Sequence, residues 1–211
     1  MSRATHSLLF LLAVGLVSPV WAEKNATLEP KISKIGSPVV SESFDKPLAA
    51  PMVGVQGQWV VSDGSLAGKE LAADKHAAVF NIQKSNRNSV VRFSFKLDDN
   101  TEGMTLSMNH AKGHLFRVTV GPSAISINLD KNKRDPASKA VVLATAEGKF
   151  DQAKWHTLQV EIVADRVVVQ TDNGLVVEAS HPSIDVDKPN YRLVMKGDSL
   201  AIDDLLIWDV E

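Results

Sequence analysis

Two histidines are spaced as zinc ligands are in some metalloproteins. His110 and His114 have the H-x₃-H spacing that puts two imidazoles on one face of a helix. Lys112 and Gly113 stand between them and predict a turn, so the helix that would give the spacing its meaning is not expected. We therefore expect no zinc site at this pair.

Adjacent carboxylates stand near the end of the chain, at Asp203 and Asp204. The apolar residues around them alternate as in a strand, so at least one carboxylate should approach the core. A buried carboxylate requires hydrogen-bond donors or a cation. Amide donors from a neighbouring loop are one solution, and a bound metal ion is the other.

The largest set of candidate ligand-binding residues is polar and follows four segments of alternating sequence, at 89–97, 104–109, 116–120 and 125–130. In each segment the apolar residues fall on one side and the polar residues on the other, which predicts strands buried on one face only. The spacing of the intervening turns predicts a meander of these four strands. Hydrogen-bonding side chains on its open face would suit sugar hydroxyls or carboxylates. The set comprises Arg92, Ser94, Lys96, Thr105, Ser107, Asn109, Arg117, Ser126, Asn128 and Asp130.

The alternative interpretation of this polar set is a solvated sheet face, which most antiparallel sheets have on one side. A sugar groove would normally add an exposed aromatic platform, and none of these strands places one outward. Both interpretations stay open at the level of the sequence.

Alternation dominates the rest of the chain from Val39 to Glu211. No window of a dozen residues has an apolar stripe at helical spacing, and Asn173-Gly174 predicts a tight hairpin turn. The fold class expected is all-β, an antiparallel two-sheet sandwich or jelly roll, in one domain over 39–211. Further strands are predicted at 140–146, 155–163, 166–171, 175–179, 191–196 and 200–210.

The N-terminus predicts export. Arg3 precedes an apolar run of ten residues, which is too short to span a bilayer, and Val20-Trp21-Ala22 has the pattern of a cleavage site. Residues 1–22 are therefore interpreted as a signal peptide and residues 23–38 as a flexible leader, since the latter are polar and aperiodic. We expect the bacterial periplasm or the cell exterior, and no membrane span in the mature chain.

Composition excludes several classes of chemistry. The chain has no cysteine, so disulfides, thiolate metal sites and cysteine nucleophiles are excluded. Its formal net charge of −2 makes nucleic acid an unexpected partner.

Several motifs resemble the landmarks of concanavalin A-like jelly rolls: Phe44-Asp45, the stretch from Gly57 to Leu66 (GQWVVSDGSL), the stretch from Trp155 to Val160 (WHTLQV), and the stretch from Ala201 to Ile207 (AIDDLLI). Within that group the chain is similar to the 3-keto-disaccharide hydrolase, or family-sixteen-like, domains of exported bacterial proteins. The resemblance implies a sandwich over about residues 40–211 and a carbohydrate as ligand. Such a fold hosts both lectins and glucanases.

The resemblance also implies where catalysis and calcium would lie. A retaining glucanase of this type carries two carboxylates on one strand in a Glu-x-Asp-x-x-Glu run, about 5–5.5 Å apart, and no run of this spacing occurs here. Carbohydrate-binding jelly rolls often hold a structural Ca²⁺ between the first and last strands. Here that implies Glu42, Asp45, Asp203 and Asp204, although Glu42 and Asp45 would face opposite ways on a regular strand and Ca²⁺ takes six to eight oxygens.

Taken together, the sequence predicts an exported carbohydrate-binding module, with a poly- or oligosaccharide as its partner and no evident catalytic pair. Two alternatives remain open. One is a glycoside-cleaving enzyme of the 3-keto-disaccharide hydrolase type, and the other is a structural or adhesive module that docks another protein.

Overall fold

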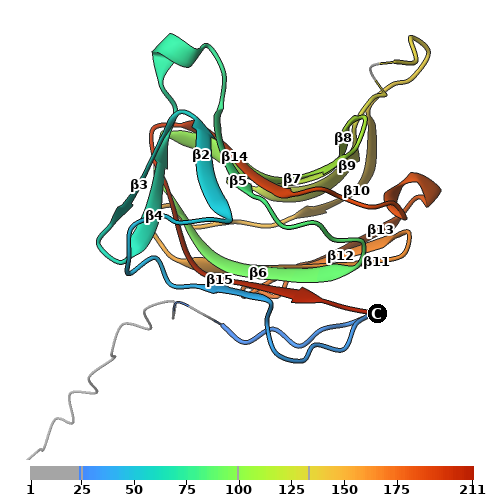
Figure 1. Ribbon diagram of the computed structural model, residues 1–211, viewed down its shortest axis with the longest axis horizontal. Helices are drawn as coiled ribbons and strands as arrows, with labels where there is room; N and C mark the ends of the chain where they lie inside the picture. Colours follow the sequence, from blue (N-terminus) through green and yellow to red (C-terminus); the bar gives the residue numbers. More distant parts are fainter. Residues whose placement is uncertain (1–23, 25, 99, 133) are drawn as a thin grey trace, which may run out of the picture.

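The computed structural model describes residues 24, 26–98, 100–132 and 134–211. Two antiparallel sheets face each other and enclose the core between them (Figure 1). The predicted two-sheet sandwich is therefore confirmed. No helix among the described residues is long and apolar enough to cross a membrane.

The first sheet, sheet A, contains four strands from the chain's second half together with four earlier strands. Its neighbours are ordered β13-β12-β11-β6-β15-β4-β3, and β1 also pairs with β15. The bounds are β1 Val40–Glu42, β3 Gln58–Ser62, β4 Ser65–Lys69, β6 Ser89–Leu97, β11 His156–Val163, β12 Arg166–Thr171, β13 Val176–Ser180 and β15 Leu200–Asp209.

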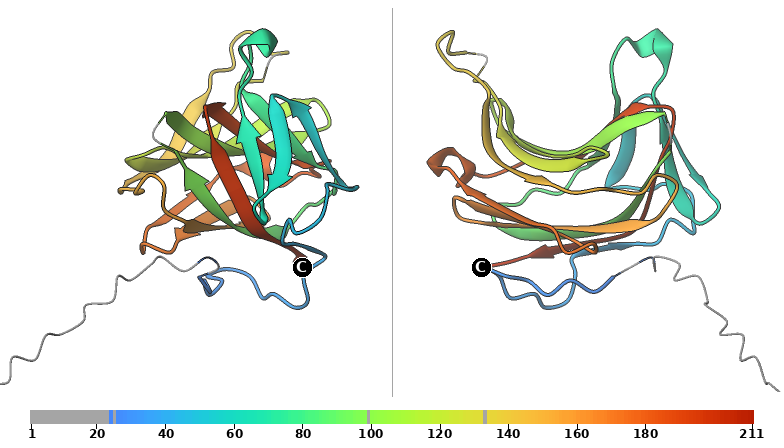
Figure 2. Two further views of the ribbon diagram at one scale, coloured as in Figure 1. Left: turned by 90° about the vertical axis from the view of Figure 1, so that its left-hand side faces the viewer. Right: turned by 180° about the vertical axis from the view of Figure 1, so that it is seen from behind.

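The second sheet, sheet B, is strongly curved, and its concave side faces away from sheet A (Figure 2). Its order is β10-β9-β8-β7-β14-β5-β2. Two short 3₁₀ helices, η1 (Ala72–Asp74) and η2 (Pro182–Ile184), lie in loops. The bounds are β2 Met52–Gln56, β5 Ala78–Ile82, β7 Thr101–His110, β8 Gly113–Val120, β9 Ala124–Leu129, β10 Val141–Glu147 and β14 Tyr191–Gly197.

The predicted four-stranded meander is wrong in one strand. β7, β8 and β9 pair in sequence, but β6 pairs with β11 and β15 in sheet A. Alternation shows which side of a strand is buried without showing which sheet the strand joins. The connection after Leu97 therefore passes from one sheet to the other instead of closing a hairpin.

The core lies between the two sheets and follows the predicted apolar parity. Phe93 and Phe95 of β6 face Leu106 and Phe116 of sheet B's strands, and all four side chains are fully buried. Burying a large apolar side chain contributes about 1.5–3 kcal/mol to stability. This packing fixes the polar sides of both sheets outward.

The β3–β4 hairpin turns at Asp63-Gly64, where both residues have positive φ, 53° and 62°. Trp59 of β3 packs on the core, with its ring centroid 5.2 Å from that of Phe80. Gly68 of β4 permits this position, because a Cβ there would come within 2.4 Å of the indole. Trp59 is thus a packing residue.

Residues 26–38, which we call the strap, run along the outer face of sheet A (Figure 1). Glu161 of β11 is fully buried there and accepts hydrogen bonds from the backbone N–H groups of Lys31, Ile32 and Ser33 at 2.7–3.0 Å. The indole Nε1 of Trp208 donates to the Gly36 carbonyl at 3.0 Å. The segment interpreted as a flexible leader is thus placed against the domain by specific contacts.

Candidate functional site

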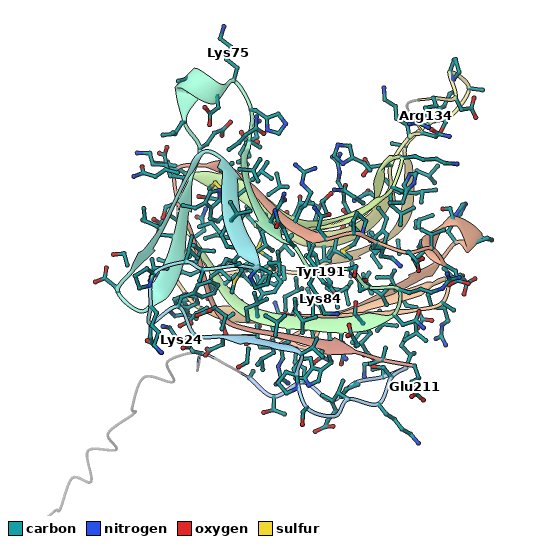
Figure 3. All side chains as sticks on the ribbon, in the orientation of Figure 1. Lys24, Lys75, Lys84, Arg134, Tyr191 and Glu211 are labelled. Carbon is teal, nitrogen blue, oxygen red and sulfur yellow. The ribbon has the colours of Figure 1, made fainter. Side chains whose placement is uncertain are left out.

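The concave face of sheet B is the open polar surface of the sandwich. It lies between two projecting loops, one that carries η1 and one that follows β9 (Figure 1). Lys75 and Arg134 mark the ends of these loops in Figure 3. Alternation in β7, β8, β9 and β14 directs one side chain in two onto this face.

Strand register aligns five polar residues in one row across the concave face. Asn128 of β9 pairs with Arg117 of β8, which pairs with Ser107 of β7. Ser107 pairs with Arg192 of β14, and Arg192 with Asn81 of β5. The predicted residues Thr105 and Ser126 belong to the neighbouring row, joined through Thr119. Sheet B therefore brings together six of the predicted ligand-binding residues, together with Asp130 just beyond β9: Thr105, Ser107, Asn109, Arg117, Ser126 and Asn128.

A hollow of about 270 Å³ lies over the middle of this row. No aspartate or glutamate is among its lining residues, and two arginines are. The lining consists of His76, Ala77, Thr105, Ser107, His114, Arg117, Arg192 and Val194. Its chemistry is therefore that of cationic and neutral hydrogen-bond donors.

Three adjacent members of the row hold buried polar atoms that have no hydrogen-bond partner among the described residues. These atoms are Ser107 Oγ, Arg192 Nε and Asn81 Oδ1. Buried polar atoms are normally paired, and an exception calls for water, an ion or a ligand. The unmet donors and acceptors lie on three neighbouring strands, β7, β14 and β5, on the same face.

The two arginines of the row differ in their partners. Arg117 Nε lies 2.9 Å from Asp130 Oδ2, so this guanidinium is partly neutralised. Arg192 has no ion pair among the described residues. Burial lowers the pKa of Arg192 from its usual value, and the positive charge of Arg117 lowers it further. Arg192 is therefore a half-buried cation that lacks an anion.

A second hollow, of about 730 Å³, adjoins the first at His114. It lies between the β7–β8 turn, the loop after β9 and the loop of η2, and its lining includes His110, His114, Asp130 and Asp185. His114 Nδ1 lies 3.0 Å from Asn109 Oδ1, while His110 Nδ1 accepts from the Lys112 N–H. The two histidines thus flank a turn, as the sequence indicated.

Arg92, Ser94 and Lys96 do not belong to this face, which corrects their assignment to the same polar surface. All three lie on β6 of sheet A. The guanidinium of Arg92 lies 5.1 Å from the ring centroid of Trp208, and the ammonium of Lys96 lies 5.4 Å from that of Trp155. Ser94 is fully buried.

Three of the four acids of the predicted calcium site lie near one another. Burial raises the pKa of Asp204, and the nearby negative charges of Asp203 and Asp45 raise it further. Asp203 forms an ion pair with Lys24 at 2.8 Å and accepts from the backbone N–H of Asp204. Glu42 accepts from the N–H of Phe44, and Asp45 from the hydroxyl of Ser43. Across the described ranges no three acidic or histidine residues form a group that could hold a metal. Ca²⁺ binding by these acids stays a prediction.

Arg192 and Asn81 were missed by the sequence reasoning. The signal for Arg192 was present, because Tyr191, Leu193 and Met195 alternate as buried residues and leave Arg192 facing outward. What could not be foreseen is that β14 lies beside β7, since pairing between distant strands has no local signature.

Comparison with solved structures shows which known fold the chain has. No model of a known protein family matches the chain, and no curated protein is similar to it in sequence. Among solved structures it is similar to a carbohydrate-binding module, CBM66, from Bacillus subtilis, with a TM-score of 0.61 and 16% identity over 75% of this chain and 95% of that one.

Two further similar structures contain oligosaccharides. The κ-carrageenase of Pseudoalteromonas carrageenovora, in complex with a tetrasaccharide of κ-carrageenan, has a TM-score of 0.60 and 11% identity over 87% of this chain and 99% of that one. LamA of Zobellia galactanivorans, with laminaritriose and laminaritetraose, has a TM-score of 0.59 and 13% identity over 83% and 100%. At these identities the likeness shows the fold alone. The chain therefore has the concanavalin A-like jelly-roll fold that its motifs resemble.

Proposed function

We propose that this protein is an exported carbohydrate-binding module and that its glycan lies on the concave face of sheet B. The observation that carries the proposal is the row of polar residues whose buried atoms at Ser107, Arg192 and Asn81 have no partner within the described chain. Pre-formed hollows with a few convergent polar groups are the usual form of small-ligand sites. The similar solved structures include a carbohydrate-binding module, which supports the same ligand class.

A glycoside hydrolase is the second candidate, since one of the structures reported above is a carrageenase. Hydrolysis by the usual mechanism requires two carboxylates that flank the scissile bond. The smaller hollow has none in its lining. In the larger hollow Asp130 is joined to Arg117 and Asp185 to Arg87, at 2.9 and 3.0 Å. The third acid of its lining, Asp187, lies 3.5 Å from the same Arg87. These contacts favour binding over cleavage.

The test is a glycan array probed with the purified domain, followed by titration of the best glycan against Ser107→Ala and Asn81→Ala variants. Loss of about 0.5–1.5 kcal/mol per lost neutral hydrogen bond is expected, a two- to tenfold weaker affinity. Ser94→Ala on sheet A is the control and should bind as the parent does. Release of reducing sugar from any bound glycan would instead establish the hydrolase.

A further inference from the structure

We infer that the glycan recognised on the concave face carries negative charge, as a carboxylate or a sulfate group, and that Arg192 is the residue that receives it. This inference rests on the proposed carbohydrate-binding function and adds the chemical class of the ligand. It starts from the fact that Arg192 is the half-buried cation of the row and has no counter-ion among the described residues.

The environment of Arg192 concentrates positive charge. Arg117 lies two strands away in the same row, at a Cα separation of about 10 Å given the usual spacing of neighbouring strands. No acid lines the hollow, and its two histidines, His76 and His114, are neutral in the formal charge count. Since the whole chain has a net charge of −2, this hollow has the opposite sign to the molecule as a whole.

Charge neutralisation explains why an anion fits this place better than a neutral sugar. A guanidinium that is partly removed from water loses hydration, and an unpaired one recovers little of that loss. A carboxylate or sulfate group matches the planar fork of arginine and can accept two parallel hydrogen bonds. The unpaired hydroxyl of Ser107, next to Arg192 in the row, can donate a third.

Arg117 has a different role in this arrangement. Its ion pair with Asp130 holds the side chain at the edge of the hollow and meets part of its charge. The negative group of the ligand is therefore directed to Arg192, while Arg117 adds longer-range attraction. Substitution of Arg192 should accordingly cost more affinity than substitution of Arg117.

The experiment compares polysaccharides that differ in charge. Retardation in affinity gels is measured with polygalacturonate and alginate as carboxylated probes, with κ-carrageenan and dextran sulfate as sulfated probes, and with agarose and dextran as neutral probes. Comparison of the carboxylated with the sulfated probes shows which of the two negative groups the protein binds. We expect retardation by at least one acidic probe, none by its neutral counterpart, and weaker retardation as salt rises.

Variants then assign the site. Arg192→Gln should weaken binding of the acidic probe about ten- to hundredfold, the cost of a lost charge-assisted hydrogen bond, while Arg192→Lys should recover only part of it. Arg166→Gln removes the same charge from sheet A and should leave affinity unchanged. The melting temperature of Arg192→Gln should match the parent, since Arg192 loses no partner among the described residues, and that of Arg166→Gln should fall only slightly, since only an exposed ion pair with Glu178 is lost.

The outcomes separate the two proposals. Equal retardation by neutral and acidic probes, unaffected by Arg192→Gln, would overturn the charge inference and leave the carbohydrate-binding function standing. Equal weakening by Arg166→Gln would show non-specific attraction and also overturn it. If no probe retards the protein and the glycan array gives no signal, both the carbohydrate-binding function and the charge inference are contradicted.

Discussion

Glu161 and Ser33 are joined by two hydrogen bonds across 128 residues of sequence: the Ser33 N–H donates to Glu161 Oε2 at 3.0 Å, and the Ser33 hydroxyl donates to the same oxygen at 2.7 Å. The same carboxylate also accepts from the N–H groups of Lys31 and Ile32 and from the side-chain amide of Gln170, the last at 3.2 Å. Glu161 has no exposed surface. Within the described part of the chain, Glu161 is therefore met by hydrogen-bond donors and forms no ion pair.

Replacement of Glu161 should be among the most destabilising single changes in the chain. Glu161→Ala leaves three backbone donors without an acceptor, and Glu161→Gln turns an amide donor toward them. We expect a loss of about 3 kcal/mol in the free energy of unfolding, measured in urea, because hydrogen bonds to a charged group are worth about 1.5–3 kcal/mol. Glu178→Gln, which breaks only the exposed ion pair with Arg166, should cost under about 1 kcal/mol. Equal costs would contradict this account.

Removal of the strap should destabilise the domain for the same reason. A chain that begins at Val39 exposes Glu161 and Trp208 and loses every N–H donor of the strap, so its melting temperature should fall. In that shortened chain Glu161→Ala should have little further effect, because the two changes remove the same interaction. A full additional loss would show that Glu161 is stabilised by other groups.

His156 should make stability depend on pH. It is buried, with Nε2 3.1 Å from the Asp151 carbonyl and Nδ1 3.6 Å from Asp172 Oδ1, which is an ion-pair distance when the ring is protonated. Burial alone would lower the pKa of His156, but the contacts with Asp172 and Asp151 outweigh it, and the net pKa lies above the usual value. A raised folded-state pKa stabilises the fold below the unfolded pKa, and this contribution is lost as pH rises through the folded pKa.

Urea unfolding at several values between pH 5 and 8 measures this effect, and an NMR titration of the imidazole gives the pKa of His156 directly. Asp172→Asn should lower that pKa and flatten the profile. A titration point below that of an exposed histidine in the parent would contradict the argument.

Lys188 should make the stability of the fold rise with pH, which is opposite to the effect of His156. Its side chain is fully buried, and Nζ donates to the carbonyls of Arg87 and Val186, both at 2.8 Å. Burial lowers the pKa of Lys188 from 10.5 to about 8. Between these two values the unfolded chain binds the extra proton, so stability due to this residue rises with pH. The difference in unfolding free energy between the parent and Lys188→Met should shift in favour of the parent by up to about 3 kcal/mol from pH 7 to 10.5.

A constant difference over that range would show that Lys188 stays protonated in the fold. Lys131→Met, at an exposed position in the loop after β9, is the control and should show no such trend.

Strands proved more predictable than their pairing. The predicted strand 89–97 has the same bounds as β6, because apolar and polar residues alternate strictly along it and so assign each side chain to one face of the sheet. Its membership of sheet A depends on β11 and β15, more than 60 residues away, and no local pattern encodes that choice. Three predicted ligand-binding residues were misplaced for this single reason.

The strap shows a second limit. Its contacts with Glu161 come from backbone N–H groups, which every residue other than proline has, so its side chains carry little signal of the docking. The residue that indicates the docking is the acceptor, Glu161. It stands among the apolar residues Val160, Ile162 and Val163, and a carboxylate buried among them needs hydrogen-bond donors. Three of the five residues in the polar row on sheet B were predicted, because Ser107, Arg117 and Asn128 stand in strands of clear parity.

The strap also determines how the domain would be presented when anchored. Lys24 and Glu211 both lie on the side of sheet A, away from the concave face (Figure 3). A tag, a fused domain or a solid support attached at either end would leave the hollow over Ser107 and Arg192 pointing outward. Immobilised protein should therefore meet long polymers as freely as the dissolved protein does.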